Sequence, residues 1–351
     1  MQEWNATLEQ QLPAHISLSL AYVGSNGIHL YEQQNYNTNI PTAGTQFRPF
    51  SPTAAAKLPV CQSSSSSYSP SACSAAQAGF GVNGAGYTPN VAFTSVQFFN
   101  SEGTSNYNSG VVAVSRKFGG VQFFSSFTWA RCLDYGSITT GGPELGNDST
   151  VYLYPSVPKK YNYGPCAFNI SKNWTSNALI PLPFHGNRLK QGWQLGIIEI
   201  ARTGNPLTPA LSAATDQSNL GNFVFDTERP DVNPNFSGPL YLKTPAQWFN
   251  PSAYKIGPLG QLGNAPKGSI TGPNLVDVDL SIMKSTKISE ATTLTIRGDF
   301  FNALNHTNFS LPSSTIFNGN AGSPILNPQV GQISTTATTA RQLQFSTTLN
   351  F

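Results

Sequence analysis

The sequence has few charged residues and no long apolar run. Only 10% of its 351 residues are Asp, Glu, Lys or Arg, whereas a soluble domain has about a quarter. The formal net charge of +3 is too small to indicate a nucleic-acid partner. No stretch reaches the roughly 18 consecutive apolar residues of a transmembrane helix. The first residues are acidic and lack the apolar segment of a signal peptide.

Motifs for catalysis or metal binding are also lacking. The sequence has no Walker A, G-x-S-x-G or H-E-x-x-H motif. Residues 79–84 fit G-x-G-x-x-G, but no predicted strand precedes them and no helix follows, so the phosphate-binding geometry is absent. The four histidines lack metal-ligand spacing; they are His15, His29, His185 and His306. We therefore expect no enzyme, no metal and no cofactor.

The chain is rich in Gly, Pro, Asn, Ser and Thr, which favours strands joined by polar loops. The last stretch, 341–351, shows the pattern most clearly. Apolar residues and Thr347 occupy one strand face and polar residues the other, because side chains alternate along a strand. The stretch ends on an aromatic residue, Phe351. This pattern is typical of a membrane β-barrel, whose strands face lipid on one side and a wet lumen on the other.

Nine segments are interpreted as strands. They are 4–11, 16–35, 107–118, 121–129, 173–182, 193–204, 276–282, 293–300 and 341–351. The connections between them are alternately short and long. Outer-membrane barrels alternate in this way because their periplasmic turns are short and their extracellular loops long. The sequence therefore predicts an all-β fold, an antiparallel up-and-down transmembrane β-barrel in the outer membrane of a Gram-negative bacterium.

The number of strands predicts a partial barrel. The connection before the last strand is long, so this strand runs down to the periplasm, and counting back, so does the first. A barrel that starts in the periplasm opens with an upward strand, and bacterial single-chain barrels have even strand numbers. We therefore expect residues 1–351 to be the C-terminal portion of a barrel with further strands upstream, which agrees with the lack of a signal peptide.

The four cysteines fall on the predicted extracellular side, where thiols oxidise. Cys61 and Cys73 share the first long connection, Cys132 ends an upward strand, and Cys166 begins the next downward one. We predict the bridges Cys61–Cys73 and Cys132–Cys166. The alternative is free or differently paired thiols.

Two further groups of side chains are candidates for function. The first group lies on the polar faces of neighbouring strands, where it either forms an ion-pair ladder that fixes the register, which we favour, or holds a plug and guides a substrate. Its members are Asp277, Asp279, Arg297 and Asp299. The second group consists of loop aromatics that either contact a ligand or pack. Its members are Trp248, Phe249 and Tyr254.

Several motifs resemble the C-terminal barrel of Oar-like TonB-dependent transporters. The most specific is Phe300-Phe-Asn-Ala-Leu-Asn-His-Thr-Asn-Phe309. Others are Leu20-Ala-Tyr-Val-Gly-Ser-Asn-Gly-Ile-His-Leu30, Thr203-Gly-Asn-Pro-Leu-Thr-Pro209, Trp248-Phe-Asn-Pro-Ser-Ala-Tyr254 and the ending 341–351. The matches span the chain in order. One departure is Lys172-Asn-Trp-Thr-Ser176, which replaces the usual Arg-His-Arg-Phe.

The resemblance implies a plug domain, a TonB contact and an N-terminal sandwich domain, none of which is in this sequence. The TonB complex would be reached through that N-terminal region. Further expected partners are outer-membrane lipid, an unknown extracellular ligand and the barrel-assembly machinery. We expect the machinery to read Phe345, Leu349 and Phe351 as a sorting signal.

Two other classes of protein fit parts of the pattern. A secreted β-sandwich or adhesin that binds glycans would explain the Asn-rich and aromatic loops. A secreted β-rich hydrolase is disfavoured because no nucleophile–base or paired-carboxylate spacing is present. The sandwich would bury its apolar faces, so Val278, Leu280, Ile296 and Phe345 packed in a dry interior would contradict the barrel.

Overall fold

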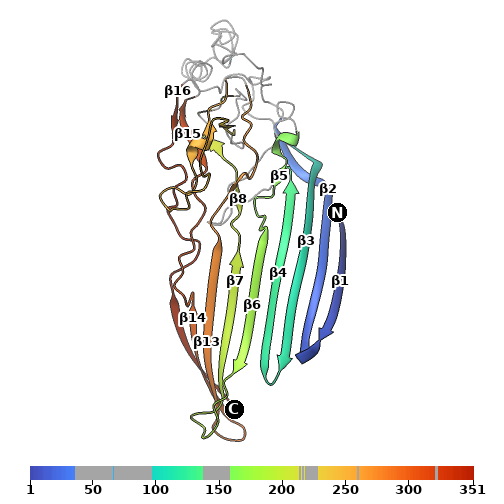
Figure 1. Ribbon diagram of the computed structural model, residues 1–351, viewed down its shortest axis with the longest axis vertical. Helices are drawn as coiled ribbons and strands as arrows, with labels where there is room; N and C mark the ends of the chain where they lie inside the picture. The colour runs from blue at the N-terminus through green and yellow to red at the C-terminus, as the bar shows by residue number, and fades with distance from the viewer. Residues whose placement is uncertain are drawn as a thin grey trace.

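The main feature of the structure is one large antiparallel sheet (Figure 1). The computed structural model describes residues 1–35, 66, 97–136, 159–212, 215, 217, 228–258, 261–320 and 323–351. Nine long strands follow one another across the sheet, each paired with the next one along the chain. They are β1 (Gln2–Leu12), β2 (Ile16–Asn35), β3 (Gln97–Phe118), β4 (Val121–Asp134), β6 (Lys172–Pro181), β7 (Trp193–Arg202), β13 (Leu275–Lys287), β14 (Thr293–Phe301) and β17 (Gln342–Asn350).

The nine predicted strands are all present, and the all-β antiparallel prediction is confirmed. Several predicted boundaries differ from the observed ones, most of all the start of β3. β3 begins at Gln97, ten residues before the predicted start at Tyr107, because its backbone continues to pair with β2 as far as Gln97–Asn35. Residues 97–106 lack a consistently apolar face, so no alternation marks them as a strand. Backbone pairing with β2 does not require an apolar face.

The two edges of the sheet run in the same direction. β1 pairs only with β2 and β17 only with β14 in the described part of the chain. Nine strands that alternate in direction leave the first and the last parallel, and both descend toward the short turns (Figure 1). An antiparallel pairing of β1 with β17 is therefore excluded by direction.

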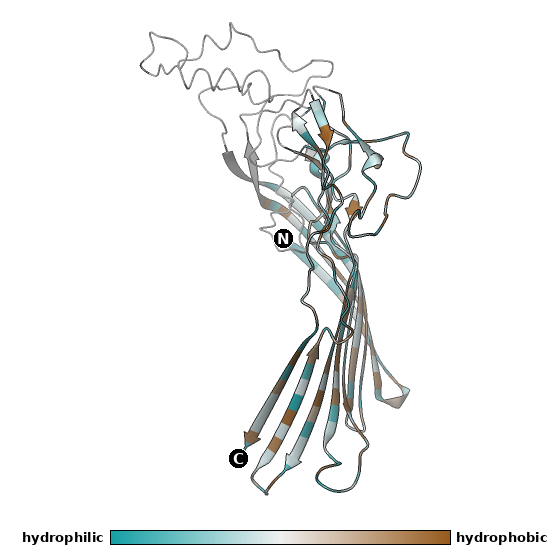
Figure 2. Ribbon diagram, turned by 90° about the vertical axis from the view of Figure 1, so that its left-hand side faces the viewer, coloured by the Kyte–Doolittle hydropathy of each residue, from teal (hydrophilic) through white to brown (hydrophobic). Residues whose placement is uncertain are grey.

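The register places apolar side chains opposite one another across the sheet. One row runs through seven strands, because directly paired residues share a face. Its members are Leu8, Leu20, Val112, Phe127, Trp174, Ala201 and Val276. Leu8 is 64% exposed and Phe127 42% exposed, so this face is not covered by a second sheet. Along the lower strands of Figure 2, hydrophobic and hydrophilic bands alternate.

The upper connections form a second body, which we call the cap: the described residues within 159–171, 203–274 and 302–341. Its short strands lie toward the upper ends of the long ones (Figure 1), and the first of them pairs with Leu133 and Asp134 at the end of β4. These are β5 (Gly164–Pro165), β8 (Pro206–Leu207), β9 (Ala210–Leu211), β10 (Asp231–Val232), β11 (Tyr254–Lys255), β12 (Ile270–Thr271), β15 (Thr315–Asn320) and β16 (Ser323–Leu326). The sequence analysis interpreted these segments only as long connections. Six of the eight short strands have two residues each, which is too short to show a period.

Helical structure is limited to single turns in the described residues. They are η1 (Pro13–His15), η3 (Lys159–Asn162) and η5 (Pro251–Ala253). No helix in this part of the chain has the length and apolar character needed to cross a membrane. η1 and the turn at Gly119 and Gly120 link strands at the end opposite the cap, where both glycines have positive φ.

Candidate functional site

The cap has the main hydrophobic core of the described chain. Phe249 is completely buried and meets Tyr254 edge-to-face, with ring centroids 6.3 Å apart. Burial also raises the pKa of the Tyr254 phenol, because ionisation would place a charge in the core. These two aromatics therefore pack, which corrects the alternative that they contact a ligand. Trp248 is half-buried, and its Nε1 donates to the Thr271 carbonyl at 2.8 Å. The other core residues are Leu207, Ala253, Ala265, Ile270, Ile316 and Val330.

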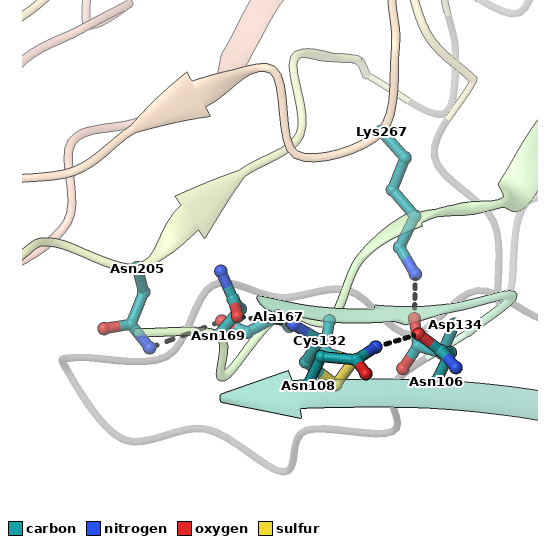
Figure 3. Close-up of a disulfide and its surroundings, with 9 residues drawn as sticks. Asn106, Asn108, Cys132, Asp134, Ala167, Asn169, Asn205 and Lys267 are labelled. Carbon is teal, nitrogen blue, oxygen red and sulfur yellow. Dashed lines mark hydrogen bonds and ion pairs between the residues drawn. A yellow bond between two sulfur atoms is a disulfide. The ribbon is translucent and has the colours of Figure 1, made fainter. Parts of the chain in front are cut away.

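A disulfide attaches the cap to the upper end of β4 (Figure 3). It joins Cys132 to Cys166, the pairing that the sequence predicted, across a Cα–Cα distance of 5.4 Å. The Cys166 N–H also donates to the Cys132 carbonyl at 3.1 Å. Asn169 Oδ1 accepts from the Cys132 N–H at 2.8 Å. The first cap segment, 159–171, is thus held to β4 by one covalent bond and two hydrogen bonds.

A buried ion pair connects the same strand end to a distant part of the cap. Lys267 Nζ donates to Asp134 Oδ1 at 2.6 Å, and the two side chains are 1% and 9% exposed. Gly164 lies directly against Lys267, where a Cβ would come within 3.0 Å of the Lys267 carbonyl oxygen. Glycine is needed at that position, because any side chain would displace Lys267 from the pair.

The motif 300–309 ties together the upper ends of three strands. Asn308 Oδ1 accepts from the Val276 N–H at 2.8 Å, and its Nδ2 donates to the Val276 carbonyl at 2.9 Å. Asn302 Nδ2 donates to the Thr339 carbonyl at 3.1 Å, next to the start of β17. Both asparagines are almost fully buried. The motif that carried the family resemblance is therefore a hydrogen-bonded junction. His306 is part of it, because its backbone N–H donates to Asn302 Oδ1.

The predicted lumen charges share one face of β13 and β14, but they do not form a ladder across the strands. Arg297 Nε pairs with Asp299 Oδ1 at 2.8 Å along β14. Across the sheet these two residues lie opposite Met283 and Ser281. Asp279 Oδ1 accepts instead from the Asn302 N–H at 2.9 Å. The favoured ion-pair ladder is corrected to one pair within a strand, because β13 places no opposite charge across from either residue. Asp277 Oδ1 accepts a hydrogen bond from the backbone N–H of Val278 at 3.1 Å, and Asp277 forms no ion pair within the described residues.

This charged face is hollowed. A depression of about 420 Å³ lies on it, and the side chains that line it come from β4, β6, β7, β13 and β14. They include Asn177, Ile198, Asp279, Ser281, Arg297 and Asp299. The apolar row from Leu8 to Val276 lies on the opposite face. The sheet therefore has a hollowed, partly charged side and an exposed apolar side.

The sequence profile of a known family, described as "Outer membrane beta barrel domain", matches residues 1–344. The chain belongs to this outer-membrane β-barrel family. It is thus located in the outer membrane of a Gram-negative bacterium, as predicted. In a barrel, an exposed apolar row is expected to face lipid, and a polar, hollowed face is expected to line the lumen. Ile296 and Phe345 are 47% and 73% exposed, so they are not packed in a dry interior.

Comparison with solved structures found a match to an outer membrane transporter. The crystal structure of the outer membrane transporter YddB from Escherichia coli superposes with a TM-score of 0.45 and 10% sequence identity. The match covers 99% of this chain and 32% of that one, so the chain spans about a third of the length of that transporter. No curated protein matches the sequence significantly.

The remaining predicted residues of the outer-membrane barrel are placed as follows. Cys61 and Cys73 lie outside the described residues. Phe345, Leu349 and Phe351 are exposed in or directly after β17, and their role as a sorting signal stays a prediction. His15 stacks on Phe118 with centroids 4.8 Å apart. In the described ranges, no group of His, Cys, Asp and Glu is arranged to hold a metal ion.

Sequence reasoning missed the polar junctions of the cap. Lys267 and Asp134 are 133 positions apart, and no local pattern relates them. The motif at Asn302 and Asn308 was noticed only through resemblance. Its clustered asparagines were the available signal, because Asn tolerates the positive φ found at Asn302 and Asn305.

Proposed function

We propose that this chain is the C-terminal part of the barrel of an Oar-like TonB-dependent transporter. The cap captures an extracellular ligand, and the lumen face forms part of the wall along which it passes. A plug and the contact with the TonB complex belong to the N-terminal region that the resemblance implies. The proposal includes no catalytic activity and no cofactor.

One observation supports this proposal most: a sheet with an exposed apolar face bears a separately packed, disulfide-linked cap at one end. The cap has its own core around Phe249 and is tied to the wall at Cys132 and Asp134. A rigid rim of this kind suits ligand capture, because binding then costs little ordering of loops. The parallel directions of β1 and β17 also support a barrel with further strands, since closure needs an antiparallel neighbour at each edge.

The alternative is a glycan-binding adhesin built on a β-sandwich. A sandwich buries the inner faces of two sheets against each other. Phe127, Ile296 and Phe345 are instead exposed. The barrel transporter is therefore the better-supported function.

The test uses the host that produces the protein. In-frame deletion of the coding sequence should leave at least one compound in the medium that the parent strain removes, as measured by mass spectrometry of spent medium. A protonophore applied to the parent should produce the same residual compound, because TonB-dependent uptake needs the proton gradient. Identical depletion by the deletion strain and the parent would contradict transport, and depletion unaffected by the protonophore would contradict dependence on TonB.

A further inference from the structure

Arg229 is a buried cation without a matching carboxylate. The residue is 4% exposed. Its Nη2 donates to the Tyr161 carbonyl at 2.5 Å, and its Cζ lies 3.6 Å from the centre of the Tyr161 ring. A carbonyl and a ring orient a guanidinium but do not neutralise it. No ion pair involves Arg229 within the described ranges, although a buried charge is costly unless paired.

A second buried donor lies beside the guanidinium. Asn162 is 3% exposed, and its Oδ1 accepts from Arg229 Nη2 at 3.5 Å. The amide orientation is fixed by this contact, because a guanidinium can only donate. Asn162 Nδ2 is therefore directed elsewhere, and it has no hydrogen-bond partner. Buried amide groups are normally paired, so this donor also needs an acceptor.

The two donors are held in place by the cap. Arg229 is flanked by backbone bonds from the Leu211 N–H to the Glu228 carbonyl, at 2.6 Å, and from the Ala265 N–H to the Pro230 carbonyl, at 3.0 Å. Asn162 ends η3, four residues before the disulfide-bonded Cys166. The positions of the donors are thus fixed by the protein itself.

We propose that Arg229 and Asn162 form a binding site for an oxyanion, either a carboxylate or a phosphate group of an extracellular ligand. A positive charge without a counter-ion and a neutral N–H donor without an acceptor, both within the described residues, match an anionic group with two or more oxygens. A cation is excluded by charge, and a neutral sugar would leave the guanidinium uncompensated. The inference rests on the proposed function only in assigning the oxyanion to a captured ligand.

The experiment measures thermal unfolding of the full chain in detergent, at constant ionic strength, with chloride replaced by inorganic phosphate or by acetate. The melting temperature of the wild type should rise saturably with at least one oxyanion. A rise with phosphate alone identifies a phosphate site, and a rise with acetate identifies a carboxylate site. Arg229→Gln should weaken the apparent affinity at least about tenfold, as expected for loss of charge-assisted hydrogen bonds. Lys160→Gln removes an exposed cation from the same η3 turn and should leave the response unchanged.

Asn162→Asp keeps the test decisive if Arg229→Gln does not fold. The new carboxylate would supply the missing counter-charge, so this variant should melt above the wild type in chloride and no longer respond to either oxyanion. The proposal is overturned if the wild type shows no saturable shift, or if Asn162→Asp still responds. Such a result would leave the transport proposal intact, because that proposal is tested separately by depletion of the medium.

Discussion

At the scale of single residues, the cap is stabilised by inward-facing polar side chains as well as by its hydrophobic core. The sequence could predict the Cys132–Cys166 pair, because the strand order alone places both residues at the same end of the barrel. It could not predict the Lys267–Asp134 pair, which depends on the path of the chain through the cap. The same holds for Asn308, whose partner Val276 is 32 positions away.

Asn308→Ala should destabilise the cap. The substitution removes two hydrogen bonds to the Val276 backbone, one to Thr338 Oγ1 and one between Asn308 Oδ1 and His306 Nδ1. We expect a loss of about 1–3 kcal/mol in the free energy of unfolding, since buried backbone groups are left without partners. Urea unfolding followed by tryptophan fluorescence measures it. The control is Asn235→Ala at an exposed position, which should change the free energy of unfolding by no more than about 0.5 kcal/mol. Equal effects of the two variants would contradict a stabilising role of the Asn308 hydrogen bonds.

Tyr254 should make the cap sensitive to alkaline pH. Its folded-state pKa is raised by burial above the usual value of about 10. Below that pH the phenol is neutral in both states, and above it the unfolded chain loses the proton first, so stability falls as pH rises. Tyr254→Phe should show a shallower fall in melting temperature between about pH 9 and pH 11. The exposed Tyr163→Phe should keep the wild-type slope, and a wild-type slope in Tyr254→Phe would contradict this account.

At the scale of elements, the nine long strands of the large sheet could be predicted from the sequence, whereas the short strands of the cap could not. A strand that crosses a bilayer alternates along the part that faces lipid, so nine alternating segments could be found one by one, as in 341–351. The cap strands are stabilised by contacts between distant segments, such as Ile270 of β12 with Leu207 of β8. Pairs of two residues leave no periodic trace, and only the packed core shows that these connections are ordered.

The two faces of β4 should respond differently to charge. Phe127 lies in the lipid-facing row and Thr128 on the lumen side. Phe127→Arg should lower the amount of protein in the outer-membrane fraction, because an arginine at the bilayer midplane costs about 2–4 kcal/mol. Thr128→Arg should leave that amount close to wild type. Quantitative immunoblots of the fractions provide the measurement, and a reversed order would invert the assignment of the faces.

At the scale of the whole molecule, the disulfide couples cap and wall. It closes a loop with a sequence separation of 34, and its loss should cost the cap about 2–4 kcal/mol. Reductant should lower the melting temperature of the wild type. The Cys132→Ser, Cys166→Ser double variant should start lower and respond less to reductant, since any remaining response must come from Cys61 and Cys73. Equal responses of the two proteins would show that this bridge is not a stabilising link.

Because the hydrophobic core of the described residues lies in the cap, the cap and the long strands depend on different solvents. Hydrocarbon takes the place of a core for the long strands, whereas the cap around Phe249 excludes water by itself. Withdrawal of detergent should therefore affect the two parts differently. The long strands would associate with those of other copies, while the cap stays folded. Protease treatment of such aggregates would release a compact fragment still bridged to a remnant of β4.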